Sequence, residues 1–166
     1  MFTVDEYMGS IKADLEKESA LLIGNLKNVF TYKFASGTDL LEFVPSIEPT
    51  RFEVSIRMFS MDKDGSEVFN EANDTAIFAG SEEVLPETAY YHVNDEQLDE
   101  FFDFYEQNEE ELMPQEQQAF ADWFRECWEA AGGESLKLPS YFAFHDEAKS
   151  YDLKNRRWVD DEEKWT

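Results

Sequence analysis

The chain's clearest candidates for acid–base or metal chemistry are its two histidines and one adjacent carboxylate. His145 is followed directly by Asp146 at the end of an aromatic segment, and His92 lies in another segment of strand-like composition. If those strands were neighbours, two imidazoles and a carboxylate could bind a divalent metal ion or transfer protons. No HExxH or HxH spacing accompanies them, and histidines at strand ends commonly have structural roles. His92, His145 and Asp146 therefore define a metal or acid–base site as an alternative hypothesis.

Two other segments contain reactive residue types, and both fit structural roles. Residues 62–65 (Asp-Lys-Asp-Gly) begin like a calcium loop, but they lack the third ligand and the closing glutamate of an EF-hand. An Asp-Gly pair between alternating segments is typical of a β-hairpin turn. Cys127 lies beside Trp128 in an aromatic helical stripe, so we expect it to pack in the core and not to act as a nucleophile.

The sequence contains no signature of a cofactor site. No GxGxxG, GxxxxGK[ST], GxSxG or CxxC pattern occurs. The pair Gly132-Gly133 directly follows a helical pattern and is typical of a helix C-terminus, not of a phosphate-binding loop. We therefore predict no cofactor and no catalytic residue, and the sequence favours a non-enzymatic protein.

The most unusual segment is acidic and helical in pattern. Between Asp95 and Glu129 there are thirteen acidic residues and one basic residue, Arg125. Like charges three or four residues apart destabilise an isolated helix by about 0.2–0.5 kcal/mol per pair. A basic partner surface would offset that cost and accelerate association, whereas the other interpretation is a solvated outer face. The predicted partner-binding residues are Asp99, Glu100, Asp103, Glu106, Glu109 and Glu110.

The whole chain has the same sign of charge as this segment. Thirty-eight acidic residues against fourteen basic ones give a formal net charge of −24. Such a field repels phosphate backbones and anionic lipid, so direct binding to nucleic acid or to a membrane surface is disfavoured. It attracts basic protein surfaces, and it also keeps a protein soluble.

The N-terminal half is expected to contain one helix, then a second short helical piece or a loop with Leu26 and Val29, and then several strands. The spacing of apolar residues predicts a helix over residues 4–15, with Thr3 as its N-cap and a break at Gly24. Alternation predicts strands at 30–34, 41–47 and 52–58, the second interrupted by an edge or a bulge at Pro45. We expect a returning strand at 67–69, a loop over 70–88 and a short strand at 89–93.

The C-terminal half is expected to contain two helices and a final hairpin. Asn94 or Asp95 caps the first helix, and Pro114 fits the first turn of the second. Residues 141–144 and 151–153 then alternate as a hairpin, followed by a turn and a further strand at 157–159.

Together these elements predict an α+β fold in one globular domain spanning residues 1–166. We expect a mainly antiparallel sheet of about five strands, an N-terminal helix and an acidic helical pair, because short turns join the neighbouring strands. A hydrophobic content of 42% is enough for a core without disulfide bonds. The single cysteine, and the lack of a signal-like or membrane-spanning apolar segment, predict a cytoplasmic location.

Three hypotheses of function follow, and the sequence leaves the oligomeric state open. The leading one is an acidic binding or regulatory protein that engages a basic protein partner. Its concrete version is an immunity-type inhibitor that presents its acidic helical face to that partner. The first alternative is an enzyme that uses the two histidines and Asp146. The second is a structural or adaptor subunit with exposed apolar patches.

Overall fold

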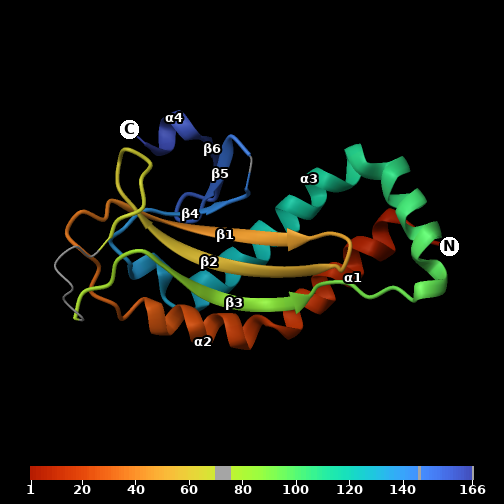
Figure 1. The fold of residues 1–166 in the computed structure, drawn as a ribbon, viewed down its shortest axis with the longest axis horizontal. Helices are drawn as coiled ribbons and strands as arrows, with labels where there is room; N and C mark the ends of the chain where they lie inside the picture. Colours follow the sequence, from red (N-terminus) through yellow and green to blue (C-terminus); the bar gives the residue numbers. More distant parts are fainter. Residues whose placement is uncertain (70–75, 146, 166) are drawn as a thin grey trace.

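The computed structural model describes residues 1–69, 76–145 and 147–165 (Figure 1). A six-stranded sheet has the order β3-β2-β1-β4-β5-β6. The pair β1 and β4 is parallel, and every other neighbouring pair is antiparallel. This confirms the α+β fold and the mainly antiparallel sheet. The strands are β1 (Leu40–Glu48), β2 (Glu53–Met61), β3 (Ser81–Ala89), β4 (Ser140–Ala143), β5 (Lys149–Asp152) and β6 (Arg157–Asp160).

The helices are α1 (Val4–Lys17), α2 (Ser19–Val29), α3 (Leu98–Ala130) and α4 (Asp161–Lys164), with short 3-10 turns η1 (Asp95–Gln97) and η2 (Gly133–Ser135). The predicted N-cap is confirmed, because the Glu6 N–H donates to the Thr3 hydroxyl at 3.2 Å. The predicted break at Gly24 is wrong. The two N-terminal helices separate at Glu18 instead, and Gly24 lies inside α2 with open space at its Cα.

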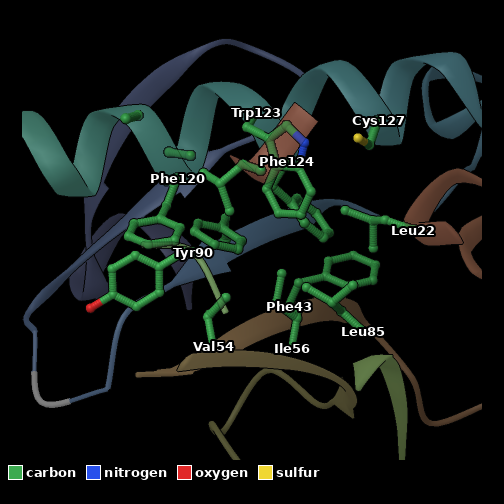
Figure 2. Packing of buried hydrophobic residues seen from close by; sticks show 14 of the residues in the cluster. Leu22, Phe43, Val54, Ile56, Leu85, Tyr90, Phe120, Trp123, Phe124 and Cys127 are labelled. Carbon is green, nitrogen blue, oxygen red and sulfur yellow. The ribbon is translucent and has the colours of Figure 1, made fainter. Parts of the chain in front are cut away.

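Helices α1, α2 and α3 cover one face of the sheet, and the main core lies between these two layers. Figure 2 shows side chains of the strands meeting those of α3 and α2. The rings of Phe43 and Phe124 are 4.9 Å apart, and both side chains are fully buried. Each such residue contributes roughly 1.5–3 kcal/mol by its burial. A smaller cluster lies on the opposite face beside the C-terminal helix α4: Leu40, Tyr141, Val159 and Trp165.

Pro45 occupies a position where its missing N–H interrupts no strand pairing. It lies opposite Ile56 in the β1–β2 pair. The Leu41 N–H donates to Pro139 on the β4 side, so by alternation the Pro45 nitrogen also faces that side. However, β4 pairs with β1 only from Leu41 to Phe43. β1 is therefore a central strand in its first half, where β4 pairs with it, and an edge strand in its second half, where Pro45 lies.

The segment that leads into α3 differs from the prediction. Residues 81–89 form the full strand β3, whereas we expected a loop there and a strand at 89–93. Irregular register against β2 between Val54 and Arg57 disturbs the alternation that would have marked the strand. The expected strands at 30–34 and 67–69 are reduced to single bridges, Phe34 with Phe78 and Glu67 with Met61. Residues 70–75 lie outside the described residues.

The two predicted C-terminal helices are one continuous helix of 33 residues, with Pro114 inside it. Proline in a helix removes one backbone hydrogen bond and its ring displaces the preceding turn, so the helix bends. Figure 1 shows α3 changing direction along its length, so that its first half extends beyond the ends of β1–β3. We call residues 98–113 the acidic arm and residues 115–130 the base. The predicted C-terminus is confirmed, since Gly132 has a φ of 96° directly after α3.

Candidate functional site

The acidic arm presents its carboxylates on the side facing away from the protein. Asp99, Asp103, Glu106 and Glu110 follow one another at spacings of four, three and four residues, which places them in one stripe along the helix. The opposite side of the arm contains Phe101, which is 1% exposed and packs against Tyr7 in α1 and against Phe2, which precedes that helix. All six predicted partner-binding residues are exposed: Asp99, Glu100, Asp103, Glu106, Glu109 and Glu110.

No basic side chain neutralises this stripe. The sequence has no Lys or Arg between Lys63 and Arg125. Within residues 1–69, 76–145 and 147–165, none of the six carboxylates forms an ion pair. The helix N-terminus stabilises negative charge only within the first turn, which contains Asp99 and Glu100. The remaining four carboxylates repel one another without compensation.

A groove of about 360 Å³ lies where the acidic arm meets the base, β1–β2 and the segment after β3. Its walls are almost entirely apolar. The groove is not predicted from the sequence, because it is assembled from segments that are far apart in the chain. The aromatic residues that line it include Tyr7, Phe52, Tyr90, Phe102, Tyr105 and Phe120.

Glu116 places one carboxylate in this apolar groove. Its Oε2 accepts a hydrogen bond from the Tyr7 hydroxyl at 2.8 Å, and its Oε1 accepts one from the Tyr105 hydroxyl at 2.5 Å. Burial raises the pKa of the Glu116 carboxyl above its usual value, and the two hydrogen bonds oppose that shift. Burial and the nearby carboxylate also raise the pKa of both tyrosine hydroxyls, so both remain proton donors at neutral pH.

Glu116 is not among the residues predicted from the sequence, although the sequence carries a signal for it. Leu112, Ala119 and Phe120 lie four residues before, three after and four after it, and all three are buried. A carboxylate at that spacing belongs to the inward face of the helix and not to its solvated face. With Met113 three residues before it, Glu116 is the one acid among the thirteen of this segment that has apolar residues at all four of the spacings i−4, i−3, i+3 and i+4.

Tyr90 adds a second polar group to the groove. Its side chain is 2% exposed, and it packs edge-on against Phe120 with ring centres 5.3 Å apart. Figure 2 shows its hydroxyl pointing away from the packed side chains. Among the described residues, the Tyr90 hydroxyl has no hydrogen-bond partner. The hydroxyl oxygen is not itself one of the buried atoms without a partner, so it is reached from the groove and is available to a ligand.

The rim of the groove is apolar and exposed. Ile47, Phe102 and Met113 line the groove and are 37%, 39% and 41% exposed. Phe102 stacks on Phe52 with ring centres 6.0 Å apart. In the helix it lies three residues after Asp99 and four before Glu106, so it borders the acidic stripe. The groove and the acidic stripe therefore form one continuous surface.

The histidines lie in irregular segments. The expectation that His92 sits in a strand is wrong: it follows β3, is exposed, and its Nε2 is 3.8 Å from the Asp14 carboxylate. His145 is exposed and comes two residues after the end of β4. Asp146 lies outside the described residues. In the part of the chain that is described, no group of three or more His, Cys, Asp or Glu side chains is arranged to hold a metal ion.

The other two candidate segments have the predicted structural roles. Cys127 is 2% exposed, and burial raises the pKa of its thiol to about 11, so it is not an activated nucleophile. The Asp62 carboxylate accepts hydrogen bonds from the N–H groups of Asp64 and Ser66, and Gly65 has a φ of 77°. This is the geometry of a turn closed by its own aspartate.

The chain matches no protein-family model, and neither a curated protein nor a solved structure shows significant similarity to it. Within the described ranges, no helix combines the length and the apolar composition needed to cross a membrane.

Proposed function

We propose that this protein is a non-enzymatic binding protein whose acidic arm engages a basic protein partner. The concrete form is an inhibitor of the immunity type, which blocks a basic toxin such as a nuclease by imitating the charge of its nucleic-acid substrate. The observation that carries the proposal is the stripe of exposed carboxylates without a neutralising base, on a helical arm that extends beyond the sheet. The reducing cytoplasm is the compartment we propose for it.

Electrostatics explains why such an arm would bind a basic protein. A stripe of one sign attracts an oppositely charged surface over a distance and increases the rate of association. Pairing with a basic surface also relieves the repulsion between carboxylates along the helix. The same charge disfavours direct contact with nucleic acid or anionic membranes.

The test is capture of a partner from host lysate at low salt, followed by elution with rising salt. We compare the wild type with the double variant Asp99→Lys/Asp103→Lys on the acidic arm. The matched control is Asp122→Lys/Glu126→Lys, which changes the net charge equally at an exposed i,i+4 pair on the base of the same helix. We expect a basic protein that elutes over roughly a few hundred millimolar salt, where exposed charges are largely screened.

The two variants distinguish binding by the carboxylates of the acidic arm from binding by the net negative charge of the whole protein. The proposal predicts that the arm variant loses the captured protein and the base variant keeps it. Equal capture by all three proteins would contradict the proposal. Equal loss from both variants would show that the total charge alone is responsible.

A further inference from the structure

The groove contains a carboxylate that nothing in its surroundings neutralises. Glu116 accepts hydrogen bonds from two neutral tyrosine hydroxyls, and none of the described residues that line the groove is Lys, Arg or His. Burial of an unpaired carboxylate is costly unless a cation is brought to it. A ligand that combines positive charge with an apolar body would satisfy both the walls and the carboxylate.

We propose that the groove binds an arginine side chain of the basic partner, with its aliphatic stem on the aromatic walls and its guanidinium group on the Glu116 carboxylate. This inference rests on the proposed function and names the contact that anchors the partner. It adds a buried, short-range contact to the exposed charges of the acidic arm.

The polar groups of the groove match a guanidinium group. Each carboxylate oxygen of Glu116 uses one of its acceptor positions for a tyrosine and keeps another. The Tyr90 hydroxyl, which lacks a partner among the described residues, offers a further acceptor. A planar guanidinium carries five N–H donors and also stacks on aromatic faces such as Phe102 at the rim.

The size of the groove limits what can enter. Its volume of about 360 Å³ is at the lower end of the ~300–1,000 Å³ found for small-molecule sites. One long side chain fits such a space, whereas a helix or a nucleotide chain does not. The charge is equally restrictive, since an anionic ligand would lie against Glu116 and beside the acidic arm.

The position of the groove joins it to the acidic arm. Phe102 belongs to both surfaces, because it lines the groove and borders the stripe between Asp99 and Glu106. Exposed charges direct the approach of a partner, while well-packed buried anchors determine how long it stays. Arginine is among the side chains enriched at such anchor positions.

In the first experiment butylguanidinium is the probe, and its binding to the wild-type protein is measured by NMR titration. Butylurea supplies the neutral isostere, and butylammonium supplies the lysine-like cation. We expect butylguanidinium to bind about tenfold more tightly than butylurea, the ratio that one charge-assisted hydrogen bond supports. Equal binding of the charged and neutral compounds would overturn the inference, and tighter binding of butylammonium would overturn the choice of arginine.

The second experiment compares variants of the groove. Glu116→Gln should weaken butylguanidinium about tenfold, and Tyr90→Phe, which keeps the shape of the core, about threefold. Glu126→Gln, exposed on the base and outside both the groove and the acidic arm, is the matched control and should leave probe binding unchanged. Urea unfolding of each variant confirms that it is folded. Unchanged binding to a folded Glu116→Gln variant would refute the role of the carboxylate.

The third experiment identifies the source of the cation. If the side chain belongs to the partner, the protein captured from lysate should elute from Glu116→Gln at lower salt than from the wild type. Probe binding that depends on Glu116, with unchanged capture, would assign the groove to a free small cation and overturn the partner assignment. Failure of the proposed function is a different result: capture survives Asp99→Lys/Asp103→Lys, whatever the probe does.

Discussion

The two halves of α3 use their acidic residues in opposite ways. In the base, the buried Arg125 donates to Glu129 at 2.6 Å, to Glu134 at 3.1 Å and to the Leu153 carbonyl at 2.9 Å. Arg156 also lies 3.7 Å from Glu129. In the acidic arm, none of the six predicted partner-binding carboxylates has a described cation within pairing distance. The base therefore has one carboxylate, Glu129, that is paired with two cations, whereas these six have none among the described residues.

The unpaired charge of the acidic arm arises from its own stretch of sequence, because no Lys or Arg lies between Lys63 and Arg125. The chain places cations where its own packing requires them: Lys164, buried beside Glu42 at 3.5 Å, is a second example. Solubility requires net charge, but it does not require a regular stripe beside an apolar groove. The contrast between base and arm is the reason for treating the arm as a binding surface and the base as the support that holds it.

The largest expected effect is on the base, where Phe124→Ala removes a ring from the centre of the core. Phe124 is fully buried and lies 4.9 Å from Phe43 and 4.8 Å from Phe142, measured between ring centres. We expect the free energy of unfolding to fall by about 4 kcal/mol. Phe102→Ala in the arm removes a ring that is 39% exposed and should cost less than about 1 kcal/mol. Equal losses in urea unfolding would show that the arm is as integral to stability as the base.

A smaller effect is expected where the base ends, at Gly133. A Cβ added there would lie 2.2 Å from the Trp128 ring, in a region where both residues are buried. Gly133→Ala should therefore destabilise the protein by about 1–3 kcal/mol, the range for overpacked cores. Gly24→Ala is the control, because nothing lies within 4 Å of the added carbon. It should stabilise α2 by up to about 1 kcal/mol, and a destabilising result would show that α2 is packed differently.

The sequence predicted the base better than the arm. The aromatic stripe with Cys127 and the glycine stop at Gly132 are local signals, and both are confirmed. Pro114 was taken as a helix start because proline favours that position. A proline can also lie inside a long helix that bends, and here the packing of Phe120 and Phe101 holds both parts in helical form.

The groove could not be predicted, because its parts come from distant segments. Tyr7 in α1, Phe52 before β2 and Glu116 in α3 meet only after the sheet and helices have packed. The strand β3, which leads to Tyr90, was missed because Pro86 and two adjacent glutamates obscure its alternation. The acidic stripe needs only helical spacing, so the sequence predicted its exposure directly.

At the junction of arm and base, Glu116→Gln should change how stability depends on pH. Burial raises the pKa of this carboxyl in the folded protein above its usual value of 4.5. The contribution of Glu116 to stability is therefore fully present below that value and is lost as the pH rises through the folded-state pKa. Glutamine does not titrate, so the stability of the variant relative to the wild type should be higher at pH 7.5 than at pH 4. Urea unfolding at several pH values measures this difference, and a constant difference would contradict it.

The smallest effect on stability, and the sharpest on binding, is expected in the acidic arm. Asp103 has acids four and three residues before it and three after it, Asp99, Glu100 and Glu106. Asp103→Lys replaces three repulsions by three attractions and should stabilise the protein by about 0.5–1 kcal/mol while it abolishes partner capture. Glu126 in the base has two such neighbours, Asp122 four residues before and Glu129 three after.

Glu126→Lys is therefore a control of the same charge change with two of the same three neighbour spacings. It should give a similar small gain in urea unfolding and leave capture intact, because it lies outside the arm. A gain in stability with loss of binding is what a surface kept for a partner should show, since its repulsion is relieved only in the complex. If Asp103→Lys gained stability and kept its partner, the arm would be no more than a solvated face.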